Sequence, residues 1–400
     1  MAAASDSGLV ERDSRVLARR FLSSIGSVGI DIEAHRIKIL QLREHKGQLF
    51  VVGAGVVDIP PNGSAEADPA GLALRVRAAF ASGRFTGRRC VVSLPPQDVC
   101  VQSTRLPSMP DEELVQAAAW EASQRFGLDR SAMEVDFVRT GATVQGSEDR
   151  EEVLLIAASH VVIRRWIDPL LAAGLRPTAV ETSFTAMARA FRRRCRREGD
   201  SDHVRAVVAV QASGSTVMIL RGDELAFCKV MATGGEEFDR SVAEHLQMDL
   251  AAAQELRSAR LASATANAEA EPFADPRTDR AVYEAIRPLL GGFVKQVMLC
   301  IRYYGVTFRG HPPGRIILTG SEAREPHLQE ALAEHCKIPV VFEDDGLPLG
   351  ALVEQIHSQH LRNPGPAGSW AVAAGLSLRG LSGRPRAGRG SASARRREAA

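Results

Sequence analysis

The chain contains the same strand-turn-strand pattern twice, and this duplication constrains the fold more than any other feature. The first copy runs from Gly29 to Leu42 and the second from Val207 to Leu220. Each copy is a short apolar strand, a tight turn and a second apolar strand. Only the first copy has an acidic residue, Asp31, within its first strand. Such a pair predicts two related lobes whose hairpin loops face one phosphate group.

The composition fits two lobes and excludes several classes of protein. The 400 residues are 45% hydrophobic and carry a formal net charge of +2, which suits two cores and gives no basic face for nucleic acid. The cysteines form no Cys-x-x-Cys pair, so neither a disulfide framework nor a zinc site is expected. Because the sequence shows no signal peptide and no run of about 20 apolar residues, it predicts a soluble cytoplasmic protein.

Residues 26–98 and 182–203 are predicted to form the first lobe. Residues 1–25 precede it as a flexible basic leader, which would pack on the lobe or contact a membrane surface. Alternating apolar residues from Val28 to Ile59 predict a three-strand meander. A helix over 69–82 and a strand over 89–94 follow, and the lobe resumes later with a helix over 184–197.

Residues 99–181 have a different rhythm and are predicted to be a module inserted into the first lobe. The pattern reads as a strand, a helix beginning at Pro110, two strands, a helix over 160–173 and a final strand over 177–181. This order describes a compact split α+β unit.

Residues 204–378 are predicted to be the second lobe. They repeat the meander, and Gly234-Gly235 then leads into a helix. The Ala- and Glu-rich segment 257–280 is predicted to be a mobile loop, and an apolar stripe over 282–304 predicts a packed helix. Residues 379–400 hold seven Arg and one Glu; they are predicted to be a disordered tail, with binding to acidic lipid or an acidic partner as the alternative.

Four groups of residues occur in an order that resembles a known family: Gly29-Ile-Asp31-Ile with Lys38; Arg105-Leu-Pro107 with Glu112 and Glu121; Gly234-Gly235; and Ile317-Leu-Thr-Gly320. The order resembles the PilM family of type IV pilus assembly proteins, relatives of FtsA within the actin-like ATPase superfamily. It covers about residues 26–378. The resemblance implies an α/β, actin-like (ribonuclease H-like) fold of two lobes with a duplicated core and an FtsA/PilM-type module inserted in the first lobe.

The resemblance also implies a place of action and a partner. Members of the family are cytoplasmic and associate peripherally with the inner membrane through other proteins. The short cytoplasmic tail of a single-span membrane protein, PilN, binds between the first lobe and the inserted module. Further inner-membrane components of a pilus are implied as partners, and a homodimer is left open. The similar cytoplasmic domain of GspL keeps the type II secretion apparatus as a competitor.

The first loop departs from the family pattern for binding ATP with Mg²⁺. Asp31 and Lys38 match, but Glu33 replaces a glycine through which the backbone would approach phosphate. A carboxylate about 5 Å from a phosphate oxygen would cost on the order of 3 kcal/mol at an effective dielectric near 20. Arg36 would offset this cost if it turned inward.

The second loop departs further, because the family's acidic Mg²⁺-anchoring residue falls on Ala209 and a glycine falls on Gln211. Phosphoryl transfer depends on positioning and on the metal, so no catalytic residue is expected, and Asp31 is the only candidate metal ligand. The candidate nucleotide-binding residues, in a degenerate site, are Asp31, Lys38, Ser213, Gly214, Ser215, Thr216, Gly234, Gly235, Gly320 and Ser321.

Several of these residues also have plainer explanations. Asp31 would cap a turn at the end of a strand, Lys38 would be a solvated charge on an exposed strand face, and Gly234-Gly235 would be an ordinary turn. Histidines such as His35 and His160 have no partner at a recognisable spacing, and no nucleophile elbow is present.

Two functions therefore compete. The favoured one is a non-catalytic scaffold, a pseudo-ATPase that recruits membrane-anchored parts of a type IV pilus or a type II secretion apparatus. The alternative is an active actin-like ATPase that binds and hydrolyses ATP to switch or polymerise. A sugar kinase is disfavoured, because the inserted module lies in the wrong place and Ala209 cannot act as a base.

Overall fold

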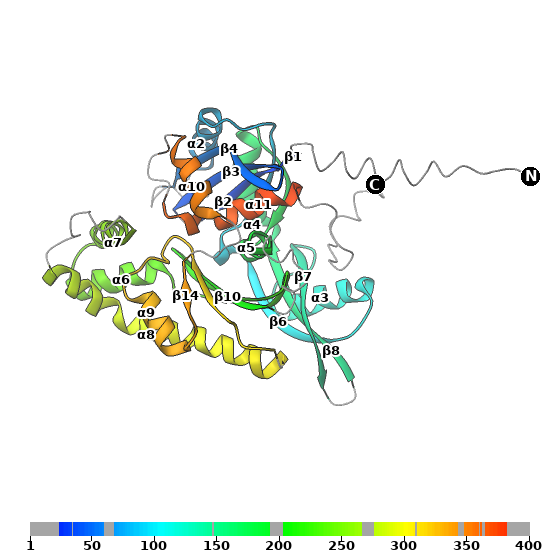
Figure 1. The fold of residues 1–400 in the computed structure, drawn as a ribbon. Coiled ribbons are helices and arrows are strands. Elements are labelled where there is room, and N and C mark those ends of the chain that lie inside the picture. The colour runs from blue at the N-terminus through cyan, green and yellow to red at the C-terminus, as the bar shows by residue number, and fades with distance from the viewer. Residues whose placement is uncertain are drawn as a thin grey trace, which may run out of the picture.

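A computed structural model describes residues 24–381 except 34, 60–67, 146–147, 193–202, 266–275, 309, 343–347, 360 and 362–364. In Figure 1 the first lobe lies at the top, the second lobe at the lower left and the inserted module at the lower right. Most of the predicted leader and tail, residues 1–23 and 382–400, lies outside the described residues.

The first lobe is built on a six-stranded sheet in the order β1-β3-β2-β5-β9, with β4 also paired to β3. Its strands are β1 (Ser24–Ile25), β2 (Val28–Ile32), β3 (Arg36–His45), β4 (Gln48–Asp58), β5 (Arg89–Ser93) and β9 (Arg176–Glu181). Apolar side chains of α2 (Pro69–Ser82) and α4 (His160–Ala172) pack on one face, and those of α5 (Ser183–Arg192) and α11 (Ala371–Ser377) pack on the other.

The second lobe is built on a five-stranded sheet in the order β12-β11-β10-β13-β14. Its strands are β10 (Val204–Gln211), β11 (Gly214–Arg221), β12 (Glu224–Met231), β13 (Ile316–Thr319) and β14 (Val340–Val341). Its helices are α6 (Gly235–Leu246), α7 (Leu250–Thr265), α8 (Pro276–Phe308) and α9 (Leu328–Cys336). β10 is antiparallel to β11 and parallel to β13, as β2 is to β3 and β5. This pairing confirms the predicted duplicated core.

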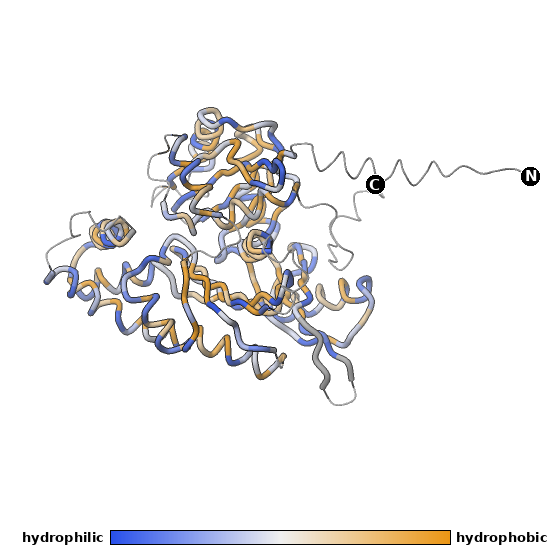
Figure 2. Tube along the Cα trace, in the orientation of Figure 1, coloured by the Kyte–Doolittle hydropathy of each residue, from blue (hydrophilic) through white to orange (hydrophobic). Residues whose placement is uncertain are grey.

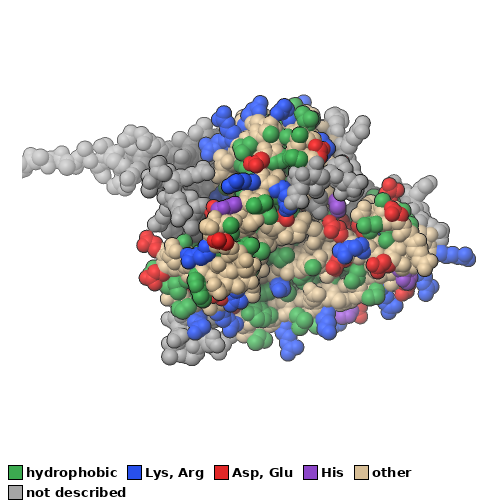
Figure 3. All heavy atoms as spheres, turned by 180° about the vertical axis from the view of Figure 1, so that it is seen from behind, with side chains coloured by type: hydrophobic (Ala, Val, Ile, Leu, Met, Phe, Trp, Pro, Cys, Tyr) green, Lys and Arg blue, Asp and Glu red, His purple; other side chains and the backbone are tan. Residues whose placement is uncertain are grey.

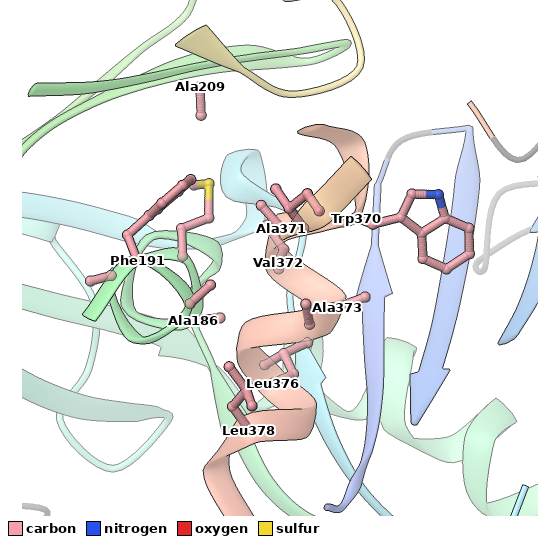
Figure 4. Packing of buried hydrophobic residues seen from close by; sticks show 14 of the residues in the cluster. Ala186, Phe191, Ala209, Trp370, Ala371, Val372, Ala373, Leu376 and Leu378 are labelled. Atoms are coloured by element: carbon pink, nitrogen blue, oxygen red, sulfur yellow. The ribbon is translucent and has the colours of Figure 1, made fainter. Parts of the chain in front are cut away.

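Strand β10 alternates between two cores. Val208 and Val210 pack with the helices of the second lobe, whereas Val207 and Ala209 face an apolar cluster, the interlobe core, that also contains Phe191 and residues of α11. Successive side chains of a strand point to opposite faces, so this continuous apolar run means that both faces are covered. Figure 4 shows Ala209 pointing from the sheet toward α5 and α11, and Figure 2 shows hydrophobic residues along the strands of both sheets.

The inserted module is smaller than the predicted 99–181. It consists of β6 (Cys100–Pro107), α3 (Asp111–Phe126), β7 (Met133–Gln145) and β8 (Glu148–Ser159), with strand order β6-β8-β7. The predicted last strand is β9, which pairs with β5 of the first lobe. Helix α4 likewise buries Trp166 and Leu170 in the core of the first lobe. The split six-element unit was therefore wrong, because periodicity does not tell which sheet a strand joins.

Two other predicted boundaries differ from the structure. The expected loop 257–280 is helical through Thr265 and again from Pro276; only residues 266–275 within it lie outside the described part. The second lobe does not extend to residue 378, because α10 (Leu349–His357) contacts β4 and α11 packs against α5. A Cβ on Gly375 would lie 1.9 Å from the carbonyl oxygen of Ala186, so α11 approaches α5 through small residues.

Short 3-10 turns connect several elements: η1 (Pro96–Asp98), η3 (Ala367–Trp370) and η4 (Leu378–Gly380). The first residue of the predicted tail, Arg379, belongs to η4, and its guanidinium pairs with Glu181. Within the described residues, no helix has the length and hydropathy needed to cross a bilayer.

Candidate functional site

The first hairpin holds a buried ion pair where a phosphate loop was predicted. Asp31 and Lys38 are directly opposed in the β2–β3 ladder. The Nζ of Lys38 donates to Oε1 of Glu33 at 2.9 Å, and both side chains are buried. Lys38 is therefore not the solvated surface charge of the plainer explanation. Arg36 does not turn inward to offset Glu33; its Nε donates to Asp58 on β4 at 2.8 Å.

Asp31 lies fully inside this hairpin. Its Oδ2 is buried without a hydrogen-bond partner. Burial, together with the Glu33 carboxylate, raises the pKa of Asp31 from 3.8 to about 8, and the charge of Lys38 only partly opposes this. An acid with this pKa is largely uncharged at neutral pH and binds a cation poorly.

We expect Asp31→Asn to stabilise the protein as pH rises. Because the folded state holds this proton up to about pH 8 and the unfolded state releases it near pH 3.8, native stability should fall across that interval. An Asn mimics the uncharged acid, so urea denaturation should show a gain on the order of 1–3 kcal/mol at pH 8 and almost none at pH 4. An equal effect at both pH values would contradict this.

The second hairpin uses its hydroxyls for internal contacts. Ser213 donates from Oγ to the side-chain oxygen of Gln97 in the first lobe at 2.8 Å. Ser215 donates to the carbonyl of Thr233 at 2.6 Å, and Thr216 is buried. These hydroxyls hold the hairpin in place instead of projecting toward a ligand.

The glycines of the second lobe converge beside this hairpin. Gly234 is the N-cap of α6, and a Cβ there would lie 2.4 Å from the backbone nitrogen of Gly214. Gly320 has φ +108°, and its Cβ would lie 2.1 Å from the carbonyl oxygen of Val210. These are close backbone contacts, so a side chain at Gly234 or Gly320 would require the backbone to shift. Ser321 follows with a buried Oγ that has no partner.

A direct contact between His35 and Glu236 joins the two lobes. His35, in the first hairpin, lies 3.2 Å from the Oε1 of Glu236 at the start of α6. The hydrogen bond to Glu236 raises the pKa of His35. With the contact between Ser213 and Gln97, this pair brings both predicted hairpins into contact with the opposite lobe. The sequence showed no carboxylate partner for His35, because Glu236 is distant along the chain.

Arg257 and its partners were missed in the sequence. The Arg257 side chain is 2% exposed and donates to Asp239, to Glu322 and to Glu325. It also donates to the carbonyl of Gly235 at 3.0 Å. Burial opposes its charge, but the carboxylates outweigh burial and raise the pKa of the guanidinium. The sequence does not reveal this cluster of Arg257 and its three carboxylates, because residues 257–280 are predicted to be a loop. A predicted helix would have placed Arg257 and Arg260 on the same side.

Glu322 of this cluster covers the start of α6. A Cβ on Gly235 would lie 2.6 Å from the Glu322 carboxyl carbon. The backbone of Gly235 would be free to approach a ligand only if Glu322 moved, and Arg257 holds that carboxylate at 2.8 Å. The Glu322 carboxylate therefore occupies the space beside Gly235 that an anionic ligand would need in order to contact the Gly235 backbone.

These residues do not match the groups that Mg²⁺ with ATP requires. Lys38 is neutralised by Glu33, Ala209 has no carboxylate, and Asp31 is largely uncharged at neutral pH. Among the described residues, no group of three or more His, Cys, Asp or Glu is arranged to hold a metal ion. The lobe-two glycines lie in close backbone contact with the second hairpin, whereas Asp31 and Lys38 are buried within the first hairpin.

A second candidate region lies where the first lobe meets the module. A small apolar cavity there is lined by Leu94, Pro96, Val99, Val101, Thr182, Ser183 and Phe184, and also by Val230 of β12 in the second lobe. The segment between β5 and β6 is held in place because Asp98 accepts a hydrogen bond from Trp166 Nε1 at 2.6 Å and pairs with Arg165. These contacts fix the segment before β6, and the residues that line the cavity are mainly apolar.

Comparison with known proteins identifies the family. A family model described as type IV pilus assembly protein PilM matches residues 29–381, which span both lobes and the module. The chain belongs to the PilM family. The resemblance seen in the sequence is thereby confirmed.

Solved structures agree on the fold of this PilM-family chain. A structure described as the PilM-PilN type IV pilus biogenesis complex has a TM-score of 0.70 at 22% identity, covering 89% of this chain and 99% of that one. EutJ, an ethanolamine utilization protein from Carboxydothermus hydrogenoformans, gives 0.48 at 12% identity, covering 94% and 99%. The cytoplasmic domain of EpsL from the type II secretion system of Vibrio cholerae gives 0.33 at 17%, covering 56% and 78%. The predicted actin-like fold is confirmed by the first of these.

Proposed function

We propose that this PilM-family protein is a docking scaffold that binds the cytoplasmic tail of a PilN-like membrane protein and does not use a nucleotide to do so. The observation that supports it best is the state of the two hairpins. Lys38 is paired with Glu33, and Ser213 with Gln97, so the groups that would hold phosphate are engaged within the chain.

The proposed docking place is the apolar seam between the first lobe and the module. The relative of known structure was solved as a PilM-PilN complex, and the family model names pilus assembly. The seam offers apolar residues from β6 and from the segment before it, including Val99 and Val101. Through this tail the protein would sit at the cytoplasmic face of the inner membrane, within a type IV pilus assembly complex.

The proposal predicts that a seam substitution weakens tail binding. The probe is a labelled peptide with the cytoplasmic N-terminal sequence of the single-span protein encoded beside this chain, and fluorescence anisotropy measures its Kd. Val101→Glu should raise that Kd by roughly 10-fold or more, because a carboxylate would be buried in an apolar contact. Leu74→Glu, on the 62% exposed Leu74 of α2, is the control and should change nothing.

Two results would reject the proposal. One is the absence of peptide binding to the native chain at high micromolar concentration. The other is peptide binding that Val101→Glu leaves intact, which would move the docking place elsewhere. Magnesium-dependent ATP hydrolysis that disappears in Asp31→Ala would instead support the active ATPase.

A further inference from the structure

The C-terminal half of α8 exposes a row of large hydrophobic side chains. Met298, Leu299, Tyr303 and Val306 all lie on its outer side, with Leu299 50% and Val306 74% exposed. The opposite side of the same turns is buried in the core of the second lobe through Val297, Cys300 and Tyr304. The helix is therefore packed on the second lobe along these turns, and the exposure of the outer row does not come from an unfolded helix end.

The spacing of this row suits contact with another helix. Leu299, Tyr303 and Val306 follow one another at intervals of four and three residues, the spacing of a helix-pairing interface, with Met298 and Arg302 on its flanks. Figure 1 places α8 along the lower edge of the molecule, and in the view from behind hydrophobic and basic side chains, with some acidic ones, are spread along the lower edge (Figure 3). We define Met298, Leu299, Arg302, Tyr303 and Val306 as the α8 face.

The charged residues of this part of α8 are all basic. Residues 287–308 contain Arg287, Lys295 and Arg302 and no acidic residue. Lys229 of β12 lies close enough to Cys300 to oppose the rise that burial causes in the pKa of that thiol. A second copy of this face, the basic leader and the Arg-rich tail would all be repelled, so the charge pattern calls for an acidic occupant.

The number of basic residues favours an acidic helix over an anionic membrane. Residues 287–308 carry three, Arg287, Lys295 and Arg302, whereas basic segments that bind anionic lipid hold about 4–8. The neighbouring Glu152 of β8 accepts a hydrogen bond from the Tyr303 hydroxyl at 3.3 Å, but its carboxylate is buried and pairs with Arg105.

We propose that the α8 face is a docking surface for an acidic amphipathic helix of a partner protein. It is separate from the PilN-like tail site, because none of the residues that line the seam cavity comes from α8. Apolar side chains of the partner would pack on Leu299 and Val306, and its flanking carboxylates would face Lys295 and Arg302.

The test uses a labelled synthetic helix of about 21 residues, with Leu at the positions that would face α8 and Glu on either side of them. Fluorescence anisotropy at low salt should show micromolar binding to the full-length chain. The double variant Leu299→Glu with Val306→Glu should weaken it roughly 10-fold or more. Val161→Glu on α4, where Val161 is 77% exposed, is the control and should leave it unchanged. Because every substituted side chain is exposed, folding should be preserved, which circular dichroism checks.

A charge swap sharpens the result. Arg302→Glu should lower affinity for the Glu-flanked helix and raise it for a matched Lys-flanked helix. Four outcomes overturn the proposal: no binding of the Glu-flanked helix, equal loss in the Val161 control, no reversal by Arg302→Glu, or binding of the native chain to anionic vesicles that the double variant abolishes. Tail-peptide binding should be the same in all these variants, so failure here leaves the seam proposal unaffected.

Discussion

Ala209→Asp is expected to destabilise the protein by about 3–5 kcal/mol and to leave ATP hydrolysis unrestored. Ala209 is fully buried in the interlobe core, facing α5 and α11 (Figure 4). The new carboxylate would be buried among the apolar side chains of this core. It would shift its pKa upward and stay protonated, so the acid that the family uses to anchor Mg²⁺ would arrive without its charge.

Urea denaturation at pH 7 measures the loss of stability, and phosphate release measures activity. The control is Ala232→Asp, because Ala232 directly follows β12, is exposed and should change stability by less than about 0.5 kcal/mol. An Ala209→Asp protein that is as stable as the control would show that water reaches this part of the interlobe core. Magnesium-dependent ATP hydrolysis in the same variant would show that the site lacks only one carboxylate.

Arg257→Met should destabilise the second lobe by about 3–5 kcal/mol at pH 7, because three carboxylates lose a shared buried cation and only Glu325 keeps another, Arg260. Those carboxylates belong to Asp239, Glu322 and Glu325, each in contact with the Arg257 guanidinium. Burial already raises the pKa values of Asp239 and Glu322 despite that cation. Without it they should rise further, so the loss should shrink as pH falls toward 5 and the acids take up protons.

Thermal and urea unfolding at pH 7 and pH 5 measure this effect. Arg287→Met is the matched control: Arg287 is on α8, 64% exposed and 3.5 Å from Glu284, so its loss should cost less than about 0.5 kcal/mol. Arg257→Lys keeps the charge but not the forked geometry and should lie between the two. A loss below about 1 kcal/mol for Arg257→Met, or one independent of pH, would show that the cluster adds no net stability.

The duplicated hairpins were predictable because their signal is local. A strand of alternating apolar residues, a turn and a second strand are contained in about 14 residues, and the pairing of β2 with β3 and of β10 with β11 follows directly.

The position of the inserted module could be predicted from the sequence, but the residues at which it begins and ends could not. β9 joins β5 across more than 80 residues of chain, and no local pattern records that choice.

The candidate site was predictable in place and less so in content. The sequence located Asp31, Lys38 and the glycines, but it could not show that Lys38 would be buried against Glu33. Nor could it pair His35 with Glu236, because that contact depends on how the lobes meet. Arg257 was hidden for a different reason: an Ala- and Glu-rich stretch has the composition of a loop and the propensity of a helix, and the buried ion pairs decide for the helix.

The most direct test of the docking-scaffold account is a titration of the PilN-like tail peptide into the native chain by calorimetry. The titration is run without nucleotide, with Mg²⁺ and ATP, and with Mg²⁺ and ADP. The side chains predicted to bind phosphate, Lys38 and Ser213, are already paired within the chain. The account therefore predicts one Kd for the peptide, equal within about 2-fold in all three conditions. Binding that requires ATP, or that tightens about 10-fold or more with ATP than with ADP, would contradict it.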